Sequence, residues 1–292
     1  MDLFLELLSN ILIPGGIFVL ITVGFSVIYS VTRILHVAHG GVVLAAGYAF
    51  YAGTVWFHWP VLAAVPWALA SAVLLGWLLN AAIYERLRDR AAVSTAGALI
   101  ATLSALLILQ NMALAIFGSG TKSLADFQGA AREFGPVVLT GNELRILVIA
   151  PIVIFLLAFF LGRTKTGKAL RAVADNEIVA EVVGIPAKKM RAVVFAVGSL
   201  LAGVAGILFA IEYNLEPGMS TGVAVRMFFR AILGGVGSVG GAVAGSLAME
   251  TATAFTGWFW NVGWTDFVGF LLMFVVLLFR PQGLWGKKKR LV

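Results

Sequence analysis

The sequence predicts an all-α membrane protein with about eight transmembrane helices, some of them broken at glycines. Hydrophobic residues make up 61% of the 292 residues and charged residues only 12%, which is too little polar cover for a water-soluble core. Uncharged apolar segments recur along the chain, and each is about as long as the roughly 17–25 residues of a spanning helix. They do not alternate like the strands of a membrane barrel. These segments are residues 11–32, 40–56, 61–84, 91–121, 146–162, 192–211 and 231–249.

Charge is confined to the segments between these stretches, and its sign predicts the topology. Seven basic and three acidic residues give +4 over residues 163–191, and residues 280–290 carry five basic residues. Three basic against two acidic residues leave +1 at residues 85–90, whereas residues 1–10 and 212–216 each carry two acidic residues. Because cytoplasmic loops are rich in Lys and Arg, the three basic segments are expected to be cytoplasmic. The net charge of +7 then reports orientation and contact with anionic lipid, so nucleic-acid binding is not expected.

The first helix is predicted to be retained as a transmembrane helix. Asp2 and Glu6 stand where a secretory signal would be positively charged, so residues 11–32 do not resemble a removed signal peptide. A glycine pair within residues 39–41 is expected to separate this helix from a second one at residues 42–57.

The middle of the chain is predicted to alternate between spans and loops. A helix leads outward from the cytoplasmic loop at residues 85–90, and the next helix returns to the cytoplasmic loop 163–191. The whole chain, residues 1–292, is expected to be one transmembrane domain with a cytoplasmic tail at residues 280–292. The predicted elements are helix 91–117, an outer loop at 118–145, helix 146–162 and helix 192–211.

Two spans remain near the carboxyl end, at residues 223–257 and 264–280. The first is interrupted by glycines, which fix little backbone, so two half-helices are expected there. Together with the break near residues 39–41, this pattern is typical of transporters built on inverted repeats, whose broken backbone lines the substrate path. The interrupting glycines are Gly234, Gly235, Gly237, Gly240 and Gly241.

Several motifs do not support a cofactor or metal site on this chain. Residues 162–168 approach the phosphate-binding pattern G-x-x-x-x-G-K-[ST], but Ala169 replaces the hydroxyl that would hold magnesium. Residues 235–240 match G-x-G-x-x-G, but they lie inside an apolar segment without a preceding strand. His36 and His39 lack a third ligand nearby, and without cysteine no thiolate site can form. We therefore expect no enzyme activity, no bound cofactor and no metal.

Ionisable residues are scarce inside the apolar segments. Glu250 is the main acidic exception, which weakens a proton-coupled carrier or a membrane enzyme. Arg226 and Arg230 are spaced four residues apart, and we expect them beside the lipid headgroups, although an outer-mouth role for anionic groups is an alternative.

Residues 168–183 form an amphipathic segment that is predicted to be one short helix, stopped by Gly184 and Pro186. Such a helix can press into a groove on another protein, or it can lie flat on the headgroups. The residues alone do not choose between these two. Its apolar side comprises Leu170, Val173, Ala174, Ile178, Val182 and Val183.

Four blocks in this order resemble permeases of ATP-binding-cassette importers of the branched-chain amino acid class. Residues 172–208, beginning AVADNEIVAEVVGIPAKK, are similar to the cytoplasmic coupling loop and following helix of that family. Residues 34–41, ILHVAHGG, look like its first-helix junction, and residues 231–242, AILGGVGSVGGA, like its late glycine-rich break. Residues 280–287, RPQGLWGK, are similar to its carboxy-terminal signature. The short amino terminus and the Ala-His-Gly form look more like the smaller of the two paired permeases.

The resemblance implies a permease subunit without an ATPase site of its own, in the bacterial plasma (inner) membrane. Its implied partners are a second permease, giving a heterodimer, two cytoplasmic ATPase subunits that carry ATP and magnesium, an extracytoplasmic substrate-binding protein, and membrane lipid. The implied mechanism is that ATP closes the ATPases, which move the helix at residues 168–184 and so alternate access to a central path. Asn176, Ala180 and Gly184 would contact the ATPase groove, flanked by Arg171 and Asp175.

The substrate path is expected at the broken backbone, where helix ends can face a carboxylate. The alternative is that the glycines only permit tight helix packing. Urea, amides or aromatic acids could replace branched-chain amino acids as cargo on the same architecture, and a stand-alone ion-coupled carrier would transport without nucleotide. The expected path residues are His39, Gly40, Gly41, Gly235, Gly237 and Ser238.

Overall fold

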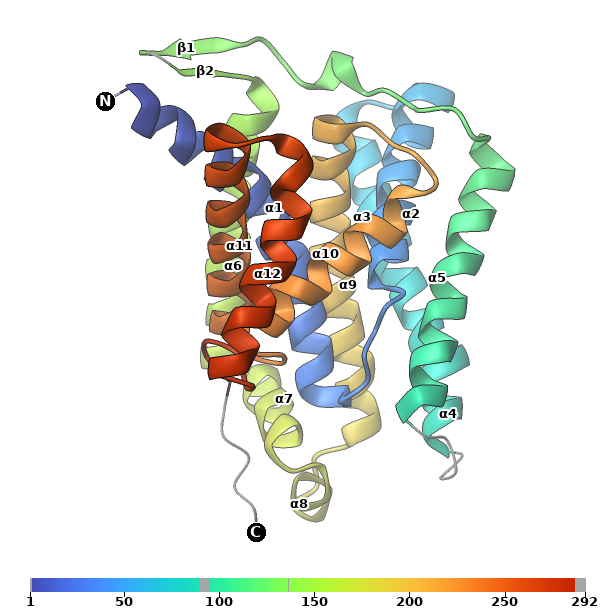
Figure 1. Cartoon of the computed structure of the whole chain (residues 1–292). Coiled ribbons are helices and arrows are strands. Elements are labelled where there is room, and N and C mark those ends of the chain that lie inside the picture. The colour runs from blue at the N-terminus through green and yellow to red at the C-terminus, as the bar shows by residue number, and fades with distance from the viewer. Residues whose placement is uncertain (1, 90–94, 136, 287–292) are drawn as a thin grey trace.

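The computed structural model describes residues 2–89, 95–135 and 137–286, and these form a helical protein (Figure 1). The sole sheet in this part of the chain is a short antiparallel hairpin, β1 (Arg132–Phe134) and β2 (Val137–Leu139), in which Glu133 pairs with Val138. The helices are α1 (Asp2–Thr32), α2 (His39–Tyr51), α3 (Val61–Leu79), α4 (Glu85–Asp89), α5 (Thr95–Phe117), α6 (Gly141–Arg163), α7 (Lys165–Asp175), α8 (Glu177–Val182), α9 (Ala187–Tyr213), α10 (Met219–Gly234), α11 (Val239–Phe259) and α12 (Thr265–Phe279). Short π- and 3-10 turns are η1 (Ala52–Trp56), η2 (Asn80–Tyr84), η3 (Ala125–Phe127) and η4 (Val262–Trp264).

The prediction of an all-α membrane protein is confirmed. Among the described residues, six helices are long and apolar enough to span a membrane, or seven spans if the bent pair α10 and α11 counts as one. Those two helices meet at 113°, at the glycine-rich break that the sequence predicts. The amino-terminal part of predicted helix 91–117 lies outside the described residues, and α5 is described from Thr95.

The basic segments gather at one end of the molecule. Figure 1 shows α4, α7, α8 and the end of α12 at the lower end, and the start of α1 and the β1–β2 hairpin at the upper end. The described parts of the three basic segments thus lie together at one end, and their location on the cytoplasmic side of the membrane stays a prediction. We refer to the lower end as the cytoplasmic end and to the upper end as the outer end.

Two helices, α1 and α9, form the centre of the protein. In their most apolar stretches 78% and 72% of the residues are buried, against 22% or less in α3, α5, α6 and α12. Since α3, α5, α6 and α12 remain apolar where they are exposed, their exposed faces suit contact with lipid.

Glycines bring the central helices close together. A Cβ added to Gly24 of α1 would lie 2.9 Å from the carbonyl oxygen of Gly198 in α9, and one added to Gly198 would lie 2.8 Å from that of Gly24. At Gly206 of α9, a Cβ would collide with the carbonyl oxygen of Val43 in α2. Small residues of this kind are what let membrane helices approach backbone to backbone.

Glycines form one of the two interruptions of the helical backbone, between α10 and α11, but not the other, between α1 and α2. Between α10 and α11, Gly235 has φ +104° and Gly237 has φ +85°, values that favour glycine. Between α1 and α2 the non-helical stretch comes earlier than the sequence predicts, because Arg33 ends α1 with φ +59°. Gly40 and Gly41 therefore lie in the first turn of α2, which corrects the expectation of broken backbone there.

Candidate functional site

The cytoplasmic segment is a pair of helices and not the single helix that the amphipathic pattern predicts. Asn176 separates α7 from α8 with an extended backbone, φ −152° and ψ 110°. Its side-chain oxygen accepts a hydrogen bond from the backbone N–H of Val179 at 3.1 Å and so caps α8. Asn competes with helix continuation because its short side chain can satisfy the next helix's free N–H groups.

The break turns the apolar side chains of the two helices in different directions. Leu170 and Val173 of α7 are buried in the core. Ile178, Val182 and Val183, at α8 and its end, are 76%, 81% and 69% exposed. The predicted single apolar face is thus an inward face on α7 and an outward face on α8.

The predicted coupling residues fall into two groups. Arg171, Asp175, Asn176 and Gly184 are exposed, as a contact with another protein requires. Ala180 is only 2% exposed and packs within the core of the chain itself. The prediction that Ala180 contacts the ATPase groove is therefore wrong for an exposed contact, because the turn at Asn176 directs this side of α8 toward the core.

The end of α8 is fixed by a backbone turn. Gly184, at φ +86°, donates its N–H to the carbonyl oxygen of Glu181 at 2.9 Å, and Ile185 donates to that of Ala180 at 2.9 Å. These two bonds define a Schellman motif, which requires a left-handed residue that glycine adopts without strain. The connection from α8 into α9 is therefore short and well ordered by its own hydrogen bonds.

An ion-pair network joins α8 to the body of the protein. Arg191 of α9 donates to both carboxylate oxygens of Glu85 at 2.7 and 2.9 Å, and to Glu177 of α8 at 2.5 Å. Glu177 also pairs with Arg88 of α4. The side chains of Arg191 and Glu85 are 9% exposed, so this bidentate pair is largely shielded from water. We refer to Glu85, Arg88, Glu177 and Arg191 as the cytoplasmic network.

A further contact ties α7 to the end of α1. The guanidinium of Arg33 donates to the carbonyl oxygen of Ala174, in the last turn of α7, at 2.8 Å. A cation at the carboxyl end of a helix also interacts favourably with the helix dipole. Both central helices, α1 and α9, are thus held to the α7–α8 pair by arginine side chains.

Of the expected path residues, those near the amino end hold helices together. His39 is fully buried. A Cβ on Gly40 would lie 3.0 Å from Cβ of Ala224 in α10, and one on Gly41 would lie 2.7 Å from Leu109 in α5. The glycines therefore allow α2 to pack closely against α10 and α5.

A buried aromatic cluster lies next to His39. The Tyr84 hydroxyl and Nδ1 of His36 share a hydrogen bond at 2.5 Å, and the rings of His36 and His39 are 5.4 Å apart. Phe195 of α9 stacks on Tyr84 at 4.9 Å. His36 and His39 thus belong to a packed junction between α1, α2, η2 and α9.

The second break packs against residues 282–286, and of the expected path residues Gly235 makes this contact. Leu284 and Trp285 donate their backbone N–H groups to the carbonyl oxygens of Leu233 and Gly234, both at 2.9 Å. Ser238 Oγ accepts from Gly241 N at 3.1 Å, so this hydroxyl caps α11. Two of the blocks that carry the family resemblance, the glycine-rich break and the RPQGLWG segment, therefore pack on each other.

At the outer half of the protein, a cavity of about 580 Å³ lies between α1, α9, α10, α11 and α12. Arg230 of α10 donates from Nε to Glu250 of α11 at 3.0 Å, and the two side chains are 5% and 7% exposed. The guanidinium carbon of Arg230 lies 3.8 Å from the ring centroid of Phe18. Arg230 is therefore buried and paired, which corrects the expectation that it lies beside the headgroups. We refer to this space as the outer cavity.

The comparisons with known proteins identify the family. The model of the family described as branched-chain amino acid transport system / permease component matches residues 7–277. The chain belongs to this family. A protein from Pseudomonas aeruginosa, the high-affinity branched-chain amino acid transport system permease protein BraD, is 29% identical, over 97% of this permease and 96% of that protein. The high-affinity branched-chain amino acid transport system permease protein LivH of Escherichia coli K12 is 27% identical, over 97% of this permease and 96% of that protein.

Two further similarities are more distant. The autoinducer 2 import system permease protein LsrC of Enterobacter sp. is 27% identical over 81% of the permease and 65% of that protein. The solved structure of PsaBC from Streptococcus pneumoniae in complex with Fab has a TM-score of 0.51 at 13% identity, covering 94% of the permease and 92% of that chain. At this identity the second similarity shows a shared fold.

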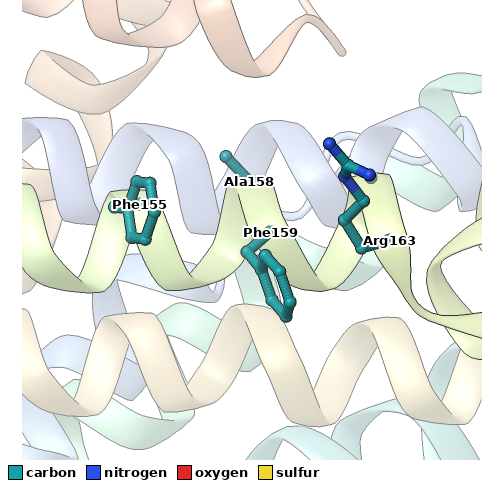
Figure 2. Close-up of a pocket in the computed structure, with 5 residues that line it drawn as sticks. Phe155, Ala158, Phe159 and Arg163 are labelled. Carbon is teal, nitrogen blue, oxygen red and sulfur yellow. The ribbon is translucent and has the colours of Figure 1, made fainter.

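A second hollow lies on the surface of α6 of the permease, and its lining residues come from this one helix, whereas several helices line the outer cavity. It is lined by Phe155, Ala158, Phe159, Gly162 and Arg163. Figure 2 shows that the labelled side chains project from one helix. Phe155 and Phe159 are mostly exposed, so this surface suits lipid contact more than specific binding.

The cytoplasmic network and the buried Arg230–Glu250 pair are what sequence reasoning missed in the permease. Arg191 and Glu85 are 106 residues apart, and no local spacing connects them. A signal did exist for the second pair, because Glu250 is the main acid within an apolar segment and a buried acid needs a cationic partner.

Proposed function

We propose that this permease forms, together with a second permease subunit, the translocation path of an ATP-binding-cassette importer for branched-chain or related amino acids. Two cytoplasmic ATPases drive it, an extracytoplasmic protein delivers the substrate, and the complex lies in the bacterial plasma membrane. The family membership supports this proposal, as do relatives with branched-chain amino acid names that match 97% of the chain.

The observation that carries the proposal is the outward apolar face of α8 at the cytoplasmic end. Ile178, Val182 and Val183 expose most of their surface in a part of the protein that projects away from the membrane body (Figure 1). Exposed apolar groups gathered on one short helix favour a protein partner. In the proposal, this face enters a groove of the ATPase, and Arg171, Asp175, Asn176 and Gly184 flank the contact; Ala180 supports α8 from inside.

The cytoplasmic network would transmit the movement. Glu177 links α8 to Arg191 of α9 and to Arg88 of α4, and Arg33 links α7 to α1. Because α1 and α9 are the central, most buried helices, a displacement of α8 reaches the centre without passing through a flexible loop. This is how nucleotide-driven motion of a separate subunit would alternate access to the path.

The path itself is proposed along the two interruptions of the helical backbone. Gly235 and Gly237 end α10 with glycine-specific geometry, and the Cβ of a residue replacing Gly237 would lie 3.2 Å from Tyr29 near the end of α1. On the other side of the proposed path, Gly40 packs α2 against α10, Gly41 packs it against α5, and His39 lies beside Gly24 of α1. In this proposal Ser238 stabilises the start of α11 by capping it. The inverted repeat stays a prediction.

Uptake in proteoliposomes tests the proposed function. The permease is reconstituted with its partner subunits, and radiolabelled leucine uptake is measured with ATP, with a non-hydrolysable analogue and without nucleotide. We expect leucine uptake with ATP and no uptake with the non-hydrolysable analogue. Equal uptake without nucleotide would favour a solitary carrier, and uptake of urea or an aromatic acid with no leucine uptake would reassign the cargo.

A further inference from the structure

The outer cavity has the dimensions and composition of a small-molecule site. Its volume of about 580 Å³ falls within the roughly 300–1,000 Å³ typical of ligand pockets. It lies between the amino-terminal half of α1, the end of α9 and the start of α12, near the outer end of the protein (Figure 1). The cavity thus lies toward the end of the protein opposite α7 and α8.

Among the residues that the structure describes, the charges that line the cavity are balanced. Two are cationic, Arg226 and Arg230, and two are anionic, Glu250 and Asp266. A site for a simple anion would carry an excess of positive charge, and a site for a cation an excess of negative charge. Complementarity therefore favours a ligand that carries one charge of each sign.

The two ion pairs differ in how easily they can open. Arg230 donates to Glu250 and, at 2.9 Å, to the carbonyl oxygen of Arg226, so it is held in place. Arg226 and Asp266 are 3.4 Å apart, with side chains 52% and 67% exposed. A long, exposed ion pair contributes little to stability. Arg226 and Asp266 can therefore separate and each bind a ligand group at a small cost in free energy.

Each member of the exposed pair matches one group of an α-amino acid. A guanidinium binds a carboxylate through two parallel N–H donors, and the Asp266 carboxylate can accept from an ammonium. The rest of the lining includes five aromatic side chains, which offer an apolar surface to a hydrophobic side chain. These aromatic residues are Phe18, Phe209, Tyr213, Phe229 and Trp258.

We propose that the outer cavity is a binding site for a free amino acid with an apolar side chain, in which Arg226 binds the carboxylate and Asp266 the ammonium. The buried Arg230–Glu250 pair forms its floor and fixes the backbone of Arg226. This inference rests on the proposed function for the class of ligand, and it assigns residues that neither the motifs nor the helix breaks indicate. Arg226 and Asp266 determine the affinity, whereas the coupling to nucleotide lies at the opposite end.

Equilibrium binding of radiolabelled leucine to the assembled transporter in nanodiscs tests the site, without nucleotide and without the extracytoplasmic protein. The variants are Arg226→Gln and Asp266→Asn, which remove one charge each from an exposed position. The matched control is Arg132→Gln, an exposed arginine on the β1 strand at the same end of the protein. Competition uses 4-methylpentanoate, which lacks the ammonium of leucine, and 3-methylbutylamine, which lacks the carboxylate.

We expect each site variant to weaken leucine binding by about tenfold or more, as the loss of a charge-assisted hydrogen bond predicts, with the control unchanged. Each analogue should compete at least about tenfold more weakly than leucine. Unchanged binding in both variants, or competition by either analogue as strong as by leucine, would overturn the site. So would native mass spectrometry that finds a phospholipid retained by the parent and lost from both variants.

The same preparations separate failure of the site from failure of the proposed function. Leucine binding that depends on Arg226 and Asp266, without any ATP-driven uptake, would leave the site standing and remove the importer proposal. ATP-driven leucine uptake with the same concentration dependence in parent and both variants would leave the importer standing and remove the site.

Discussion

The cytoplasmic network makes a sharp prediction for the substitution Glu177→Gln. This change keeps the size of the side chain and removes the charge that Arg191 and Arg88 share at α8. The bidentate contact between Arg191 and Glu85 remains, at 2.7 and 2.9 Å. The protein should therefore fold and insert normally, while α8 loses most of its ionic attachment to α9 and α4.

The magnitude follows from the two lost contacts. A hydrogen bond to a charged group contributes about 1.5–3 kcal/mol, which applies to the contact of Glu177 with Arg191. The side chain of Arg88 is 38% exposed, and an exposed pair of this kind contributes about 0–1 kcal/mol. Together the attachment of α8 should weaken by about 1.5–4 kcal/mol. This corresponds to a roughly 10- to 700-fold lower ratio of attached to detached α8.

Hydrogen exchange and transport measure the two consequences. Backbone amides of α8 should exchange faster in Glu177→Gln by up to the same factor, because local opening controls their protection. Leucine taken up per ATP hydrolysed should fall, since α8 then moves with the ATPase but carries less of the motion to α9. The control is Glu181→Gln, the same charge change at an exposed position of α8 outside the cytoplasmic network. Parent-like exchange and parent-like coupling in Glu177→Gln would refute the role of the network.

Three further predictions concern the outer cavity, the helix packing and the partner surface. Glu250→Leu leaves Arg230 buried without its partner and should lower the unfolding free energy by about 3–5 kcal/mol, whereas the double change with Arg230→Met should recover much of this loss in a thermal melt. Gly245→Ala forces a Cβ 2.6 Å from the backbone nitrogen of Gly234 and should cost about 1–3 kcal/mol. Gly240→Ala in the same helix meets no atom of the described residues within 4 Å and should be neutral or stabilising, so equal melting temperatures of the two variants would contradict the packing argument. Ile178→Asp should abolish copurification of the ATPase with an unchanged melting temperature, because this side chain is 76% exposed; intact copurification would exclude the α8 surface.

The membrane architecture could be predicted from sequence because the bilayer restricts the choice of structure so strongly. Uninterrupted apolar stretches must be helical to satisfy their backbone groups, and the break at Gly235 and Gly237 requires backbone angles that glycine adopts easily. The first break was harder to place, because Gly40 and Gly41 can serve equally in a turn or in close helix packing. Their neighbours on α10 and α5 decide for packing.

The candidate site was predicted less well, for two physical reasons. Asn176 lies within an apolar helical pattern, and its capping side chain outweighs that pattern, which turns Ala180 inward and exposes Val182. The partners of Arg191 and Arg230 depend on tertiary contacts, since Glu85 is 106 residues from Arg191 and no helical spacing connects them. Local spacing predicts which surfaces are apolar, but it does not predict which distant charges meet.

Site-specific photo-crosslinking from α8 tests most directly whether energy enters the permease through the α7–α8 pair. A benzoylphenylalanine replaces Val182, which is 81% exposed, and a second version carries it at Phe134 on the hairpin at the outer end. After irradiation of the assembled transporter, we predict an adduct between position 182 and the ATPase subunit, and none with this subunit from position 134. An assembled, ATP-driven transporter that gives no ATPase adduct from position 182 would contradict the proposed route.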